Sequence, residues 1–328
     1  MIEWEYPRGM EVRMGSLPLV IHTEVFSDEA RRWLAERTEL IACKPGEPLF
    51  EQRAAEAVGL LVRTYTQVDD ALLDQMPALK VVGRAGVGID NIDVPACRTR
   101  GVEVVYTPDA NTQAVAEYVL ALICDSMRPR KRLVDPAELA DWSTMRTTYR
   151  AQRQIDECTI GIVGLGRIGK RVARMLAGLG CRVLFNDLLD MHVDHCSGAE
   201  PVSLETLFEQ SNIVTIHIDG APTNKHWINE RILSLMPADA ILINTSRGFV
   251  VNRADLVTHL RTHPEAQAYL DVHDPEPPHP DDPLLTLENA FIYPHLASRT
   301  ETGMRRMSDV VHDIWAVIQG EPPRYPAP

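Results

Sequence analysis

The sequence predicts an α/β protein built from two domains with parallel sheets. The chain has 328 residues, which is long for one ordinary domain and suits two. It is 45% hydrophobic and 24% charged, the usage of an ordinary globular protein. Short β-rich runs alternate with helical segments in two successive series, and such alternation is typical of parallel sheets covered by helices.

The first series covers residues 17–107. Strands are expected at 18–22, 59–63, 79–83 and 102–106, and helices at 27–36 and 69–76. A long helix at 112–127, apolar at helical spacing, then connects the two series. The second series has expected strands at 159–163, 181–186, 213–218, 240–244, 267–272 and 290–293. A final amphipathic helix at about 300–318 could serve either domain.

A glycine motif follows the first strand of the second series. Gly164, Gly166 and Gly169 enclose Leu165, Arg167 and Ile168, and a helical stretch begins at once afterwards. The first glycine permits a tight turn, the second lets backbone N–H groups approach a pyrophosphate, and the third allows close packing of helix and strand. The motif therefore predicts a dinucleotide-binding (Rossmann) domain, because it lies between a strand and a helix.

Asp187 ends the next apolar run, 187 − 169 = 18 positions after the last glycine of the motif. A carboxylate about 20 residues beyond the motif meets the adenosine ribose hydroxyls in such domains. Its charge would repel a 2′-phosphate. We therefore expect NAD, rather than NADP, as the cofactor.

Composition excludes several other classes of function. The formal net charge of −13 argues against a nucleic-acid partner. Six cysteines are scattered without C-x-x-C spacing, so neither a zinc site nor a disulfide framework is indicated. Residues 1–5 carry acids where a signal peptide would carry bases, and no apolar run approaches the ~18 residues of a membrane span. We expect a soluble, cytoplasmic protein without membrane partners.

Three further polar patches lie at the ends of expected strands of the second series, where ligands of open α/β sheets bind. They are residues 243–248, 270–277 and 293–298. With these motifs, the chain resembles the D-isomer-specific 2-hydroxyacid dehydrogenases, and within them the phosphoglycerate dehydrogenase branch, over residues 62–320. The resemblance implies an NAD-binding Rossmann domain at 110–298. A flavodoxin-like substrate domain would then comprise 1–109 plus 299–328, with no room for a C-terminal regulatory domain.

The chemistry of 2-keto acid reduction accounts for three residues of the polar patches. Reduction of a 2-keto acid needs a proton donor beside the nicotinamide, and histidine suits this role near neutral pH. The resemblance assigns His295 as the acid and base, and Glu276 as the carboxylate that orients the imidazole. It assigns Arg247 as the clamp for the substrate carboxylate, because the guanidinium offers a fixed fork of donors. We expect no metal, since these groups already supply the electrophilic and proton-transfer roles.

The resemblance also assigns cofactor contacts. Asp271 and the backbone of Thr245 correspond to positions at the nicotinamide carboxamide, and His217 to one near the adenine-side ribose; a buried packing histidine is an equally good interpretation of His217. Residues 219–223, Asp-Gly-Ala-Pro-Thr, depart from the Pro-Leu-Thr pattern of the family. The details of this wall of the cofactor site therefore stay open.

Substrate contacts are expected from the first domain. The glycines of residues 83–88 let the backbone N–H groups of Val87 and Gly88 point at an anion, which the resemblance identifies as the substrate carboxylate. Arg63 and Arg84 match positions where phosphoglycerate dehydrogenases place guanidinium groups near the substrate phosphate. A phosphorylated substrate and an unphosphorylated one both stay open.

The resemblance leaves several functions open for this chain. The protein could act on 3-phosphoglycerate, on glyoxylate or hydroxypyruvate, or on erythronate 4-phosphate, and the family also includes NAD-sensing corepressors that bind partner proteins. A basic stretch around Trp142 lies in the region that forms an arm on a second subunit in relatives, but it departs from the family pattern, and a solvated loop is the other interpretation. We therefore expect a homodimer that acts on a small 2-keto or 2-hydroxy acid.

Overall fold

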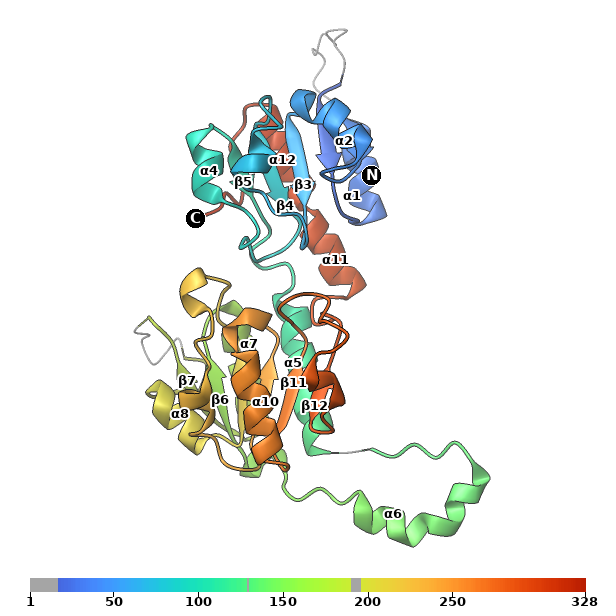
Figure 1. Ribbon diagram of the computed structural model, residues 1–328, viewed down its shortest axis with the longest axis vertical. Coiled ribbons are helices and arrows are strands. Elements are labelled where there is room, and N and C mark those ends of the chain that lie inside the picture. Colours follow the sequence, from blue (N-terminus) through green and yellow to red (C-terminus); the bar gives the residue numbers. More distant parts are fainter. Residues whose placement is uncertain (1–16, 129, 190–195) are drawn as a thin grey trace, which may run out of the picture. The chain divides into compact units, whose positions relative to one another are not determined.

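The computed structural model describes residues 17–128, 130–189 and 196–328, in two compact units (Figure 1). Residues 1–5, on which the expectation about a signal peptide rests, lie outside the described part. The first unit comprises the residues up to Ala85, Asn91–Thr107 and Ser308–Pro328. The second comprises Gly86–Asp90 and Pro108–Met307.

The first unit contains a parallel sheet of five strands in the order β2-β1-β3-β4-β5, which is the flavodoxin-like order. The strands are β1 (Leu19–His22), β2 (Glu39–Ala42), β3 (Gly59–Val62), β4 (Val81–Arg84) and β5 (Glu103–Val105). The sequence analysis missed β2. This strand lies at the edge of the sheet and none of its residues is fully buried, so it lacks the continuous apolar run of a central strand.

Short helices connect these strands: α1 (Asp28–Ala35), α2 (Pro48–Arg53), α3 (Asp70–Leu73) and α4 (Val94–Thr99). Polar side chains cap three of them, since Ser27, Asp69 and Asp93 each accept a hydrogen bond from a backbone N–H in the first turn. The prediction of one final helix is wrong. Two helices occur, α11 (Glu301–Ser308) and α12 (Val310–Ile318), and α12 packs on the first unit's sheet against Val20 and Leu61.

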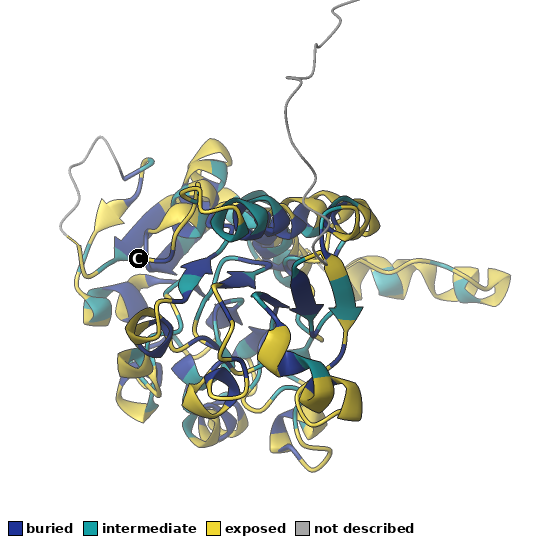
Figure 2. Cartoon of the chain, turned by 90° about the horizontal axis from the view of Figure 1, so that it is seen from above, coloured by how far each residue is buried: buried dark blue, intermediate teal, exposed yellow. Residues whose placement is uncertain are grey.

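The second unit contains a seven-stranded parallel sheet in the order β12-β11-β10-β9-β6-β7-β8, which is the dinucleotide-binding arrangement with one added strand. The strands are β6 (Thr159–Val163), β7 (Arg182–Asn186), β8 (Glu200–Pro201), β9 (Ile213–Ile216), β10 (Ile241–Asn244), β11 (Gln267–Leu270) and β12 (Ala290–Ile292). The central strands are buried and the outer faces of the helices are exposed (Figure 2). The sequence analysis missed the two-residue edge strand β8.

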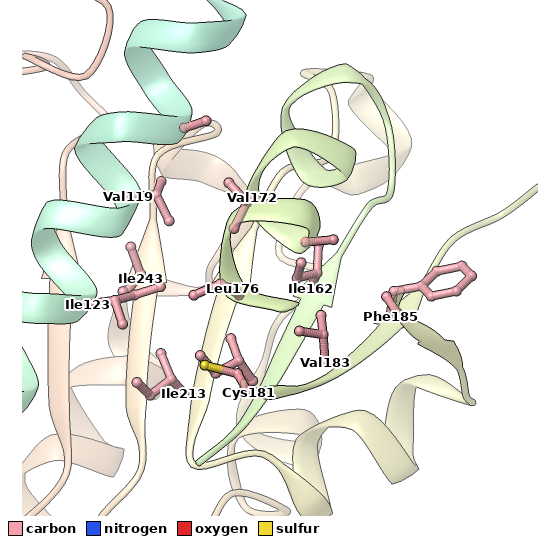
Figure 3. Packing of buried hydrophobic residues seen from close by; sticks show 14 of the residues in the cluster. Val119, Ile123, Ile162, Val172, Leu176, Cys181, Val183, Phe185, Ile213 and Ile243 are labelled. Atoms are coloured by element: carbon pink, nitrogen blue, oxygen red, sulfur yellow. The ribbon is translucent and has the colours of Figure 1, made fainter. Parts of the chain in front are cut away.

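The helices of this unit are α5 (Thr112–Met127), α6 (Trp142–Thr148), α7 (Arg167–Gly178), α8 (Leu204–Gln210), α9 (Glu230–Leu233), α10 (Arg253–Thr262) and α11 up to Met307. The bounds predicted for α5 are confirmed. Val119 and Ile123 of α5 pack with Val172 and Leu176 of α7 in one cluster against the sheet (Figure 3). A cluster formed by α8, α9 and α10 also packs on this sheet. In the described ranges, no helix is long and apolar enough to cross a bilayer.

Candidate active site

The glycine loop joins β6 to α7 in the conformation that the motif predicts. Gly164 has φ +91°, and a Cβ on this residue would lie 2.9 Å from the carbonyl of His217. A Cβ on Gly169 would lie 2.2 Å from the carbonyl oxygen of Gly164, so the helix packs closely on the loop. At Gly166 a Cβ would meet no atom within 4 Å, and this N-cap supplies no side-chain hydrogen bond to the first turn. These features fit a pyrophosphate held by the N-terminus of α7.

Asp187 follows β7 and lies against the glycine loop. Its carboxylate accepts hydrogen bonds from the backbone N–H of Leu165 at 2.6 Å and of Leu189 at 3.0 Å. This places the acid beside the loop, as a ribose-binding carboxylate requires. Arg167 forms an ion pair at 2.8 Å with Asp109 at the surface, and Ile168 packs against the α5 and α7 cluster.

Two buried polar atoms line the ends of β9 and β10. The Nε2 atom of His217 lies 3.0 Å from the Thr215 hydroxyl, while its Nδ1 atom has no hydrogen-bond partner among the described residues. Desolvation lowers the pKa of His217 to about 3, which keeps the ring neutral at physiological pH. The Thr245 hydroxyl is likewise buried without a partner in the described ranges. Such atoms are suited to hydrogen bonds with a bound cofactor.

Glu276 and His295 meet at the carboxyl ends of β11 and β12, which pair in parallel. The His295 Nδ1 atom lies 2.9 Å and 3.1 Å from the two Glu276 carboxylate oxygens. Burial opposes ionisation of Glu276, but its hydrogen bond with His295, the charge of this imidazole and a hydrogen bond from the His273 backbone N–H together lower its pKa. The Glu276 carboxylate is therefore charged at neutral pH beside the imidazole of His295.

Asp271 holds the loop that carries the histidine. Its side chain is buried, and its two oxygens accept hydrogen bonds from the backbone N–H groups of Leu296 at 2.7 Å and Ala297 at 2.9 Å. Burial raises the pKa of Asp271, and the two N–H bonds oppose this rise. His295 itself has φ +55°, a strained conformation for a residue with a side chain. Asp271 thus fixes the backbone directly after the strained residue.

His273 is a residue that the sequence analysis did not single out. Its backbone N–H donates to Glu276 at 3.0 Å, and its ring Nε2 lies 2.7 Å from the carbonyl oxygen of Tyr293. The residue therefore ties the loop after β11, which carries Glu276, to the loop after β12, which carries His295. The single histidine in an Asp-Val-His run gave no periodic signal that could have identified this role.

Arg247 follows β10 and forms a bidentate ion pair with Asp90. Its Nε and Nη2 atoms donate to the two Asp90 oxygens at 3.0 Å and 2.6 Å, and its Nη1 atom donates to the Ser246 carbonyl at 2.8 Å. Burial opposes the charge on Arg247, but the hydrogen bond and charge of Asp90 and the charges of Glu276 and Asp219 raise its pKa. The charge of Glu276 therefore favours the charged form of the Arg247 guanidinium. Asp90 follows shortly after the glycine segment of residues 83–88 and was given no role from the sequence.

The expected substrate contacts divide between the two units. Val87 and Gly88 belong to the segment Gly86–Asp90, which groups with the second unit, and a Cβ on Gly88 would lie 1.8 Å from the Arg247 Nη2 atom. Arg63 and Arg84 belong to the first unit, at the carboxyl ends of neighbouring strands β3 and β4, where Val62 pairs with Arg84. The Arg63 side chain is buried. Within the described residues, no group of three or more metal-ligating side chains was found.

Comparisons with known proteins identify the family of this chain. Residues 120–297, more than half of the chain, match the model of the D-isomer specific 2-hydroxyacid dehydrogenase, NAD binding domain. A glyoxylate reductase from Aeropyrum pernix is 35% identical over 285 residues, which are 85% of each chain. A D-3-phosphoglycerate dehydrogenase from Methanocaldococcus jannaschii is 31% identical over 92% of this chain and 58% of its own length.

Solved structures give the same result. A D-lactate dehydrogenase from Aquifex aeolicus, complexed with NAD and lactic acid, superposes with a TM-score of 0.78 at 26% identity, over 92% of this chain and 96% of that one. The chain therefore belongs to the D-isomer specific 2-hydroxyacid dehydrogenases, a family of NAD-dependent oxidoreductases, and its second unit contains the NAD-binding domain of that family.

Proposed function

We propose that this protein interconverts a D-2-hydroxy acid and its 2-keto acid, with His295 as the proton donor in reduction and the acceptor in oxidation. The contact between His295 and Glu276, at 2.9 Å, carries the proposal. Because Glu276 occupies the Nδ1 side of the ring, the Nε2 side is left to exchange a proton with the substrate oxygen. Glu276 fixes the tautomer and the orientation of the ring through its hydrogen bond.

Arg247 would bind the substrate carboxylate and polarise the carbonyl. A guanidinium presents two parallel N–H donors that match a carboxylate, and Arg247 makes this bidentate contact with Asp90. The backbone N–H groups of Val87 and Gly88, next to this guanidinium, would complete the anion site. The substrate would then be held by its carboxylate while its carbonyl oxygen faces the acid.

We assign cofactor binding to the second unit, which also carries Arg247, Val87 and Gly88 of the anion site, while Arg63 and Arg84 belong to the first. Gly164, Gly166 and Gly169 would hold the pyrophosphate, and Asp187 the adenosine ribose, which favours NAD over NADP. Residues expected on the remaining wall of the cofactor site are Arg167, Ile168, His217, Thr245, Asp271 and His295. Bound NADH supplies the hydride, and the protein supplies the proton and the clamp for the carboxylate.

For the substrate, we propose a short 2-keto acid such as glyoxylate or hydroxypyruvate. The similarity to glyoxylate reductases supports this choice, since it extends over most of both chains. A phosphorylated acid such as 3-phosphoglycerate is the second candidate. The arginines Arg63 and Arg84 favour it, because they lie at the ends of two adjacent strands.

We also propose a cytoplasmic homodimer. Among the described residues, Cys43, Cys97, Cys124, Cys158 and Cys181 are free thiols, which suits a reducing compartment. The segment containing α6 exposes large apolar side chains, including 51% of Trp142 and 56% of Leu139, and such exposure favours a partner surface. Analytical ultracentrifugation of the wild type and of Trp142→Ala tests the assembly. Sedimentation of the wild type as a monomer would contradict it.

Two variants test the chemistry. A panel of 2-keto acids with NADH should show turnover that His295→Ala lowers by about 10²-fold or more, while NADH binding stays within about threefold of the wild type. Near-normal turnover of the variant would refute the role of His295.

On the same panel, Arg84→Ala should reduce kcat/KM selectively for phosphorylated acids if those are the substrates, and equally for all acids if they are not. Binding of NADH without turnover of any acid would instead favour a corepressor-like binding protein.

A further inference from the structure

The guanidinium nitrogens of Arg247 already donate hydrogen bonds to a carboxylate of the same chain. Two of its nitrogens donate to the two oxygens of Asp90, and the third donates to the Ser246 carbonyl. The Arg247 side chain is 25% exposed and that of Asp90 is 30% exposed. The pair therefore lies at the edge of solvent, where a small anion can reach it.

The backbone around this pair admits no larger residues. A Cβ on Gly88 would lie 1.8 Å from the Arg247 Nη2 atom, so a side chain at this position would displace the guanidinium. On the other side, a Cβ on Gly220 would lie 2.9 Å from Asp90 Cγ and 3.0 Å from its Cβ. Gly220 stands in the segment of residues 219–223 that departs from the pattern of the family. Both glycines therefore make room for the contact between Asp90 and Arg247.

We propose that Asp90 is an internal competitor for the substrate carboxylate, which must displace it from Arg247. The inference rests on the proposed function, in which Arg247 binds that carboxylate. Two carboxylates cannot share one fork without strong repulsion, so binding of the substrate requires the Asp90 oxygens to leave. When no substrate is bound, Asp90 pairs with the Arg247 guanidinium, because an unpaired charge in this partly buried site would cost free energy. The need to displace Asp90 also weakens the binding of every carboxylate. Anions that fit the site poorly and make few other contacts then do not bind.

Another role for the same residue makes the opposite prediction. If Asp90 were a positioning residue that holds Arg247 ready for the substrate, its removal would lower kcat and weaken carboxylate binding. If Asp90 competes, its removal lowers KM for the keto acid and strengthens the binding of any carboxylate analogue, while kcat changes little. The sign of the change in affinity therefore separates competition from positioning.

The experiment measures the dissociation constant of oxamate, an unreactive analogue of a small 2-keto acid, by titration calorimetry with NADH present. Asp90→Asn removes the charge, and Asp90→Ala also removes the remaining hydrogen bond. Gly220→Ala displaces the Asp90 side chain without changing any charge. We expect all three variants to bind oxamate more tightly, by about tenfold for Asp90→Ala, which corresponds to about 1.4 kcal/mol. KM for the keto acid should fall in parallel.

Asp219→Asn is the matched control, because Asp219 acts on Arg247 through its charge, while its carboxylate accepts hydrogen bonds from the Ala221 backbone N–H and the Asn224 side-chain amide. Its oxamate affinity should stay within about threefold of the wild type. Unchanged or weaker binding in both Asp90 variants would overturn the inference, and so would equal tightening in Asp219→Asn. Thermal melting checks that each variant is folded, and Gly220→Ala tests the idea even if one Asp90 variant is not.

Failure of the proposed function can be distinguished from failure of the competition by Asp90. If the wild type reduces keto acids and Arg247→Lys loses oxamate binding, the proposed function holds, and unchanged Asp90 variants refute the competition alone. If the wild type neither reduces any keto acid nor binds oxamate, Arg247 is not a carboxylate site. The proposed function is then wrong, and the competition falls with it.

Discussion

Replacement of Glu276 by glutamine tests the proton-transfer dyad most directly. The amide keeps the size of the side chain and one oxygen that can accept from His295 Nδ1, but it removes the negative charge that lies 2.9 Å from the imidazole. Both side chains are largely shielded from water, with 19% of Glu276 and 30% of His295 exposed. A hydrogen bond to a charged group contributes about 1.5–3 kcal/mol in such settings.

This energy sets the expected loss of activity. If all of it favours the protonated imidazole that donates to the substrate, kcat for reduction falls by about 10- to 150-fold, since about 1.4 kcal/mol is tenfold. The NADH dissociation constant should change little, because Glu276 acts on the imidazole. The lowered pKa of Glu276 means that the wild-type carboxylate is charged throughout the neutral range, so the difference between the wild type and the variant should persist across neutral pH.

Stopped-flow measurement of NADH oxidation in a single turnover gives the rate of the chemical step without product release. Glu288→Gln serves as the control, because this acid is exposed and follows shortly after Glu276 in the sequence. We expect its rate to match the wild type. A Glu276→Gln enzyme within about threefold of the wild type would show that the carboxylate does not assist the imidazole, and the reasoning from the dyad would be wrong.

Three further predictions concern other residues. Asp187→Ser should raise the kcat/KM ratio of NADPH to NADH by about tenfold; a wild type that already prefers NADPH would contradict the ribose assignment. His273→Ala should lower kcat about fivefold through the lost hydrogen bond to the Tyr293 carbonyl, while His273→Gln restores it; equal rates in both variants would refute the tether. His217 has a folded-state pKa of about 3, below its unfolded value of 6.5, so its contribution to stability is present above pH 6.5 and is lost as the pH falls toward 3. His217→Gln should therefore flatten the pH dependence of the free energy of unfolding by about 1.4 kcal/mol per pH unit between about pH 6 and about pH 4, as urea titrations would measure; an unchanged slope would contradict this.

Local patterns determined much of the fold. The glycine loop could be predicted because its function requires three glycines at fixed spacing. At each of these positions a side chain would clash, φ is positive, or an anion must approach the backbone. Strands that are buried on both faces appear as apolar runs, and so the central strands of both sheets were predictable. The edge strands β2 and β8 were not, because an exposed strand needs no continuous apolar run.

The residues proposed for proton transfer were also predictable, since they stand in compact motifs directly after predicted strands. Tertiary structure alone decided which partners they meet. Arg247 pairs with Asp90 across 157 positions of sequence, and Asp271 binds the backbone of the loop that holds His295. No short pattern encodes such contacts, because they arise only when parallel strands bring the ends of distant segments together. The sequence determines which chemical groups the site contains, and the packed sheet determines the charge that each group faces.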